Sequence, residues 1–180
     1  GLVGSSLTDH KQIAEITRSL ASKASGVSLA SLRADNLSES VACAIGEAGQ
    51  KTITIAPETG SEAMLKNIKK KVHLGRMAES MRGAIDQGIS IKLNMIFGFP
   101  DEKRVDIFRS MVFLAKMAWL GVDDVTVSTF VAYPGSEMFR QLQASGRIPQ
   151  ENDDFYYALI GYGDAKNLTS FAEHLGSREL

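Results

Sequence analysis

Residues 51–71 constrain the fold more than any other part of the chain. They begin with the β-branched run Thr52–Ile55, which predicts a strand of about five residues that ends at Pro57. Turn and N-cap residues follow at 59–61, and apolar residues then recur at helical spacing. Glu58 is therefore expected at the carboxyl end of a strand, in a loop that leads to a helix. In parallel α/β folds, ligands bind at that edge of the sheet.

The same succession of an apolar strand and an amphipathic helix repeats along the chain. Five βα units in series predict an α/β fold with a parallel sheet and right-handed crossovers. Besides the central strand, strands are expected at residues 1–4, 27–32, 89–97 and 125–132.

Amphipathic helices are expected between these strands, and the longest spans residues 103–120. Shorter helices are expected to begin at Asp9 and Ser38, and Gly121 is expected to end the long one. The apolar residues of the long helix predict a stripe that is buried against the sheet. That stripe comprises Val105, Phe108, Met111, Val112 and Ala115.

Length and composition fit one soluble globular domain. The 180 residues are 44% hydrophobic and 23% charged, and their net charge of -1 gives no overall attraction to nucleic acid or acidic membranes. No apolar run approaches the roughly 18 residues that a spanning helix needs, so we expect a cytoplasmic protein with no membrane partner. The βα core is expected over residues 1–146 and an irregular extension over 147–180, and both ends look cut from a larger protein.

Polar residues gather on or just after the ends of the predicted strands. A carboxylate at a strand tip suits a ribose diol because it accepts two hydrogen bonds, although a first-turn helix acid is the simpler role for Glu58. Asn94 lies in an otherwise apolar strand, so a neighbouring strand or a ligand must satisfy its amide. The residues gathered at this edge are Ser5, Ser6, Ser31, Arg33, Glu58 and Asn94.

Cationic residues near this edge allow two interpretations. The lysines at 69–71 are either a solvated helix end or a site for an anion. Arg33 either holds an anionic group or pairs with Asp35, which is the simpler account. The three histidines are too dispersed to indicate a metal site, and the single Cys43 excludes an internal disulfide.

Four short motifs in the correct order resemble those of radical S-adenosylmethionine (SAM) enzymes. The segments APETGSE at 56–62 and LNMIFGFPDE at 93–102 look like the fourth- and fifth-strand motifs of that superfamily. YPGS at 133–136 is similar to its turn after the sixth strand, and LVGSS at 2–6 to its second-strand end. The resemblance covers roughly residues 1–145 and is greatest to the Fe-S oxidoreductase branch that often carries a cobalamin-binding domain, with methylthiotransferases more distant.

For the fold, this resemblance implies a partial TIM-type (β/α)6 barrel in which the chain supplies strands two to six. By position, Ser5 and Ser6 would lie near the methionine amino group of SAM. Lys70 would lie near the methionine carboxylate, where relatives often have Arg, and Glu58 near the ribose.

The adenine of SAM would be bordered by the fifth-strand motif. The resemblance places Asn94 and the backbone of Ile96, Phe97 and Gly98 there. The sequence itself leaves two roles open for Gly98, a structural turn or a close approach on which a flat aromatic ligand lies. Ser31 and Arg33 complete the set of expected cofactor-binding residues.

In such enzymes a [4Fe-4S] cluster, held by three cysteines of a CxxxCxxC loop, cleaves SAM reductively to a 5′-deoxyadenosyl radical. This chain has no such motif, and Cys43 lies inside a predicted helix. We therefore expect a fragment of a radical SAM enzyme that supplies much of the SAM-binding rim, acts on an unknown substrate and is inactive alone. The cluster, and cobalamin if the branch assignment holds, would belong to the larger protein.

Two other interpretations stay open from the sequence. The chain could be a complete non-redox βα-barrel domain that binds a nucleotide or phosphate ester through Arg33 and the lysines at 69–71. Alternatively, an exposed sheet edge at Leu2 and Val3 could pair with a second chain as a dimer. The sequence gives no direct sign of nucleic-acid binding.

Overall fold

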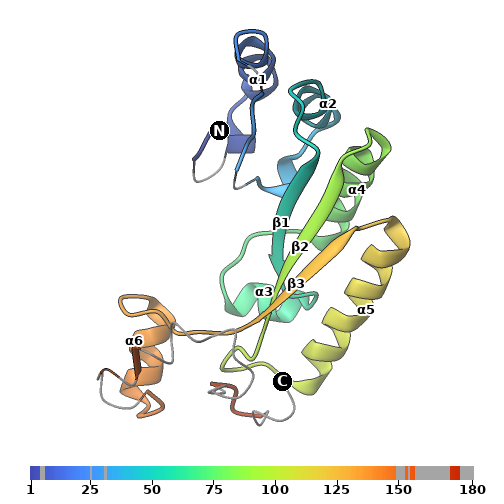
Figure 1. Ribbon diagram of the computed structural model, residues 1–180. Helices are drawn as coiled ribbons and strands as arrows, with labels where there is room; N and C mark the ends of the chain where they lie inside the picture. Colours follow the sequence, from blue (N-terminus) through green and yellow to red (C-terminus); the bar gives the residue numbers. More distant parts are fainter. Residues whose placement is uncertain are drawn as a thin grey trace.

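The computed structural model has an α/β architecture, with the sheet at its centre (Figure 1). Helices α1 (Ile13–Ala21) and α2 (Glu39–Glu47) lie near one end of the sheet, and α6 (Glu137–Ala144) lies near the other. Three expected site residues, Ser5, Ser6 and Ser31, lie outside the described residues. The structure describes residues 1–4, 7–24, 26–30, 32–148, 153, 155–156 and 171–174.

Three parallel strands form the sheet within the described residues, in the order β1-β2-β3. They are β1 (Thr52–Glu58), β2 (Ser90–Phe97) and β3 (Asp124–Thr129). The prediction of an α/β fold with a parallel sheet is confirmed. Five strands are not shown, because the first two predicted strands contribute one isolated parallel bridge, between Leu2 and Leu29.

The side chain of Gln50 explains why the segment around Leu29 does not pair more extensively with a neighbouring strand. Gln50 Oε1 accepts a hydrogen bond from Leu29 N at 2.8 Å, and Gln50 Nε2 donates to Leu29 O at 3.2 Å. On the other side, Ala30 N donates to Leu2 O at 3.1 Å. The amide of Gln50 therefore satisfies backbone groups that a neighbouring strand would otherwise pair.

Alternation along β2 divides the sheet into two faces. Ile91, Leu93 and Met95 are fully buried in the main apolar core, which also contains residues of α4 (Leu74–Asp86) and α5 (Arg104–Leu120). Lys92, Asn94 and Ile96 are only partly buried and belong to the opposite face. The main core thus leaves a more polar face of the sheet available for a site.

Helix boundaries follow the local signals in most places. Ser38 Oγ caps α2 by accepting from Val41 N at 3.4 Å, and Gly121 ends α5 with a φ of 102°. The expected start at Asp9 is wrong, because Asp9 closes a short 3-10 turn (Leu7–Asp9) and α1 begins only at Ile13. A second such turn spans Ala34–Asn36. Within the described residues, no helix combines the length and the apolar character needed to cross a membrane.

The buried stripe predicted for α5 is wrong. Val105, Phe108, Met111, Val112 and Ala115 are all exposed. The helix instead buries Asp106, Ser110, Phe113 and Met117. Large apolar residues occur around most of this helix, so their spacing does not fix its orientation, whereas two polar residues that need buried partners do.

A second, smaller apolar cluster lies around α6 and the described part of residues 147–180. It contains Ala132, Phe139, Leu142, Ile148, Phe155 and Phe171. Phe130 is packed against this cluster, and its ring lies 5.1 Å from that of Phe99 between centroids. The turn after β2 is therefore anchored to the second cluster through aromatic contacts.

Candidate functional site

β1 ends in an irregular turn that redirects Glu58. The strand was expected to stop at Pro57, yet it continues to Glu58, because the pairing register with β2 shifts between Ile55 and Glu58 and accommodates the proline. Glu58 has a φ of 68°, in the left-handed region. For a residue with a side chain, that conformation costs roughly 1–3 kcal/mol and persists only where surrounding contacts impose it.

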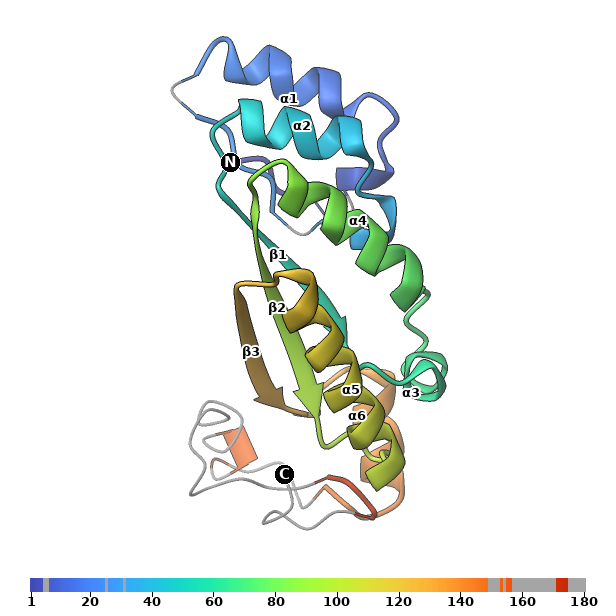
Figure 2. The same cartoon turned by 90° about the vertical axis from the view of Figure 1, so that its right-hand side faces the viewer.

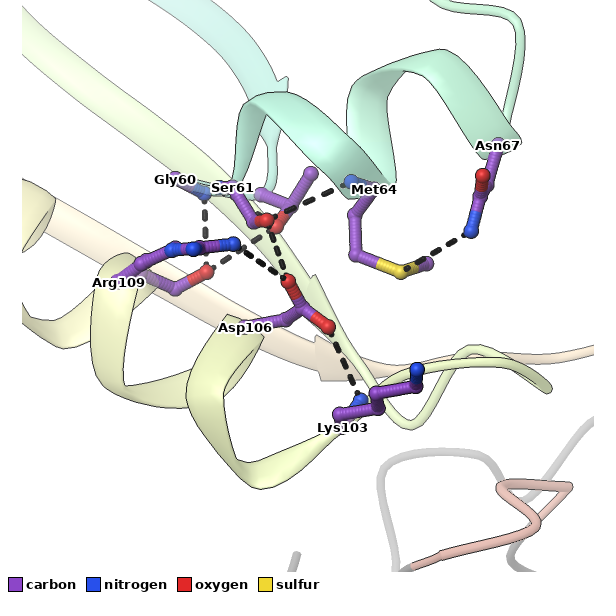
Figure 3. A network of polar contacts seen from close by, with 9 residues as sticks. Gly60, Ser61, Met64, Asn67, Lys103, Asp106 and Arg109 are labelled. Atoms are coloured by element: carbon purple, nitrogen blue, oxygen red, sulfur yellow. Dashed lines mark hydrogen bonds and ion pairs between the residues drawn. The ribbon is translucent and has the colours of Figure 1, made fainter.

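Hydrogen bonds that Ser61 and Asp106 make supply part of that support, with the Asp106 carboxylate as acceptor (Figure 3). Ser61 caps α3 (Glu62–Asn67) by accepting from Met64 N at 3.4 Å, and its hydroxyl donates to Asp106 Oδ1 at 2.6 Å. Lys103 N donates to the other oxygen of Asp106 at 3.2 Å. Because Ser61 and Asp106 are both buried, these bonds fix the start of α3 against α5.

Ser110 on α5 holds Thr59 and Gly60, the residues just before Ser61, in the same way. Gly60 N donates to Ser110 Oγ at 2.9 Å, and the hydroxyls of Thr59 and Ser110 are hydrogen-bonded at 3.1 Å. A Cβ on Gly60 would lie 2.5 Å from Phe113 Cβ and 2.7 Å from Ser110 Cα. Glycine is therefore required for the turn to approach α5 this closely.

Glu58 meets Lys70 in a half-buried ion pair. Lys70 Nζ donates to Glu58 Oε1 at 2.6 Å and to the carbonyl oxygen of Ala56 at 2.5 Å. The side chain of Lys70 is 27% exposed and that of Glu58 is 21% exposed. The pair is therefore partly shielded from water but can still be reached by a ligand. A lysine ammonium has three donors, which leaves one for a further acceptor.

Three expected site residues line one pocket beside this pair. Arg33, Lys70 and Asn94 contribute to a cavity of about 360 Å³ between β1, β2 and the segment that precedes α2. Thr54 and Met77 are also among its lining residues. Pockets that hold small ligands in proteins span about 300–1,000 Å³, so the volume suits part of a nucleoside-sized molecule.

Asn94 lines this pocket and carries an unsatisfied acceptor that is itself buried. Its Oδ1 is buried and has no hydrogen-bond partner among the described residues. A buried amide oxygen without a partner is costly, and a ligand that donates an N–H or O–H group would remove that cost.

Arg33, Lys69 and Lys70 are paired with carboxylates or backbone oxygens. Arg33 forms the local ion pair with Asp35, at 2.9 Å, and this contact raises the pKa of the guanidinium. Arg33 also donates to Lys71 O at 3.0 Å. Lys69 bonds both oxygens of Glu137 at 2.7 Å and lowers the pKa of that carboxyl, so only Lys70 of the three lysines lines the pocket.

Glu58 and the expected residues at the end of β2 lie outside the pocket lining. Ile96, Phe97 and Gly98 are not among the residues that line it. Gly98 has a φ of 87°, so a turn that favours glycine is present at this position.

Sequence reasoning missed Glu102, which lies behind this turn. Its carboxylate is fully buried and accepts from Gly98 N at 2.5 Å, while its Oε1 has no partner among the described residues. Burial raises the pKa of Glu102 above its ordinary value. An acid four residues after a strand-end glycine was the available signal, but only the fold reveals that it is buried.

The described residues do not fit an iron–sulfur cluster. Cys43 lies on α2 with its Sγ 3.4 Å from Glu47 Oε1. Across the described part of the chain, no three His, Cys, Asp or Glu side chains are grouped so that they could hold a metal ion.

Comparisons with known proteins give partial matches. No protein-family profile matches the chain. The uncharacterized protein MJ0966 of Methanocaldococcus jannaschii is 35% identical over 107 residues, which is 59% of this chain and 23% of that protein. The uncharacterized methyltransferase PH0819 of Pyrococcus horikoshii is 26% identical over 141 residues, which is 78% of this chain and 30% of that protein. This chain therefore spans less than a third of the length of either relative.

Solved structures also share the fold, and one of them is a synthase. The crystal structure of methylornithine synthase (PylB) superposes with a TM-score of 0.50 and 16% identity, over 69% of this chain and 35% of that one. At that identity the similarity concerns the fold alone.

Proposed function

We propose that this chain is part of a radical SAM enzyme and that the pocket beside β1 binds part of SAM. The observation that carries the proposal is the left-handed Glu58, paired with Lys70, which lines a pocket together with Arg33 and Asn94. The order of the sequence motifs supports it. The fold similarity to methylornithine synthase is consistent with the α/β core that the motif resemblance implies.

The residues present suit binding and orientation of SAM. Glu58 Oε2 is available to accept from a ribose hydroxyl. The amide of Asn94 would have to turn toward the pocket to accept from a ligand N–H, because its Oδ1 is buried. The third donor of Lys70 suits the methionine carboxylate. In the whole enzyme a [4Fe-4S] cluster would supply the electron that cleaves SAM. Because the described residues do not fit that cluster, the role proposed for this chain is to hold SAM, and methyl transfer is the reaction class proposed for the longer protein.

The charge balance of the site favours SAM over a phosphate ester. Arg33 and Lys70 are each paired with a carboxylate, Asp35 and Glu58, so the local charges sum to zero. A phosphate would bring about two negative charges to this site and would have to compete with both carboxylates. SAM carries a sulfonium cation beside its amino and carboxylate groups, so a balanced site accommodates it better.

Titration with SAM followed by NMR chemical shifts tests the proposal at the weak affinity expected from a partial site. We expect saturable shifts, and we expect Glu58→Gln to weaken binding by about 10- to 100-fold, because a hydrogen bond to a charged group contributes about 1.5–3 kcal/mol. Glu137→Gln is the matched control. Glu137 also pairs with a lysine, Lys69, at 2.7 Å, but neither residue lines the pocket.

The outcomes separate the candidate ligands. Equal binding by the two variants would show that Glu58 is not a ligand of SAM. Saturable binding of adenosine monophosphate without binding of SAM would favour the nucleotide-binding interpretation and reject ours.

A further inference from the structure

The outward face of α5 carries an apolar stripe over four turns. Val105, Phe108, Val112 and Trp119 are exposed by 48%, 67%, 39% and 93%. From the first to the last of them, α5 rises about 21 Å. Exposed apolar residues scattered singly are normal, but four large ones on one side of a helix favour a contact surface.

A groove lies beside this stripe, between α4 and α5. The two helices lie on the same side of the sheet (Figure 2), and the groove between them has a volume of about 370 Å³. Phe113 and Met117 are its buried residues, while Phe108 and Val112 line it from the exposed face of α5. On α4 the lining residues include Gly75 and Ala78, so the backbone of a third helix can approach closely.

The charges at this groove all have one sign. Among the described residues that line it, only Arg109 and Lys116 are charged. Arg109 is half-exposed and makes one long contact, 3.4 Å, with Asp106. Asp106 is the sole acid of α5 and is buried, so it presents no negative charge at the surface. A complementary partner must therefore bring carboxylates next to apolar side chains.

We propose that the groove between α4 and α5 binds an amphipathic helix of a partner protein. Its apolar face would fill the groove, and its Asp or Glu side chains would pair with Arg109 and Lys116. A second copy of this chain suits the surface less well, because a two-fold contact would place these cations against one another. A lipid surface suits it less well too, because the groove is concave and only two cations flank it.

Trp119 gives a direct readout, since it is the only tryptophan of the chain and lies on the stripe. The probe is an 18-residue helical peptide with Leu at i, i+3, i+4 and i+7 and Glu on both flanks. A matched peptide carries Lys in place of each Glu. We expect the acidic peptide to shift the Trp119 emission saturably to shorter wavelength and the basic peptide to bind at least tenfold more weakly.

Variants distinguish specific binding in the groove from non-specific hydrophobic binding. Phe108→Ala removes an exposed ring and is expected to weaken the acidic peptide about tenfold or more, with the far-UV circular dichroism unchanged. The double variant Arg109→Glu and Lys116→Glu is expected to prefer the basic peptide. The control, Lys11→Glu and Lys23→Glu, changes the same charge on exposed residues flanking α1 and is expected to keep the original preference.

Three results would overturn the proposal. One is that both peptides shift the Trp119 emission equally, or that neither peptide shifts it. Another is an emission shift with phosphatidylglycerol vesicles but not with the acidic peptide, which would indicate a membrane surface. The third is a dimer in sedimentation equilibrium that Phe108→Ala abolishes, which would show that a second copy occupies the groove.

Discussion

Gly60→Ala tests the contact on which the candidate site depends. The added Cβ would lie 2.5 Å from Phe113 Cβ, 2.7 Å from Ser110 Cα and 3.1 Å from Arg109 O. Two of these three atoms belong to the backbone of α5, so no side-chain rotation relieves the clash. The turn and the helix must separate by about 1 Å to restore ordinary van der Waals contact.

The expected cost has two parts. Overpacking of this kind destabilises a protein by about 1–3 kcal/mol. Separation of the turn from α5 also breaks the 2.9 Å bond from Gly60 N to Ser110 Oγ. Because Gly60 is partly buried, leaving its N–H unpaired costs up to about 1–3 kcal/mol more. We therefore expect Gly60→Ala to lower the free energy of unfolding by about 2–6 kcal/mol, a large part of the 5–15 kcal/mol typical of a domain.

Urea unfolding followed by far-UV circular dichroism measures this loss. With a urea dependence of about 2 kcal/mol per molar, the midpoint is expected to fall by about 1–3 M. Gly83→Ala is the control, because Gly83 lies within α4 and a Cβ there would meet nothing within 4 Å. That substitution is expected to stabilise the protein by about 0.5–1 kcal/mol. If Gly60→Ala unfolds at the wild-type midpoint, the turn does not contact α5 as described.

Two further predictions concern buried polar groups. Both Ser61→Ala and Ser136→Ala remove an N-cap, but Ser61 also donates to buried Asp106 at 2.6 Å, so its loss should cost about 1–2 kcal/mol more in urea unfolding. Equal losses would mean that the bond to Asp106 adds no stability. Burial raises the folded-state pKa of Glu102 above its ordinary 4.5, so its contribution to stability is complete below that pH and is lost as the pH rises through the folded pKa. Glu102→Gln should therefore gain stability relative to wild type as the pH rises above 4.5, and parallel curves of stability against pH would contradict this.

Local signals predicted most of the elements. The β-branched run of β1 and the caps at Ser38 and Gly121 act within a few residues, so the sequence alone reveals them. Pro57 was misjudged because a bulge, which depends on the neighbouring strand, lets β1 continue past it. The short bridge at Leu29 was also out of reach, since it depends on the side chain of Gln50, 21 residues away.

The candidate site was predictable in outline but not in its contacts. The ends of parallel strands lie at one edge, which is why the sequence could place Arg33 and Asn94 together, and both line the pocket. Glu58 does not line it and contacts it only through Lys70. The left-handed backbone of Glu58 and its bond to Lys70 arise only in the folded chain. Whether these residues bind SAM stays a prediction until ligand binding is measured.

Asp106 and Ser110 connect the error about α5 with the geometry of the site. Each satisfies its buried polar atoms on the turn after Glu58, and together they determine which face of α5 is turned inward. Because that inward face is partly polar, the large apolar residues of the helix are left on its outer face. The same buried hydrogen bonds therefore support the turn that follows Glu58 and expose the stripe that contains Phe108 and Trp119.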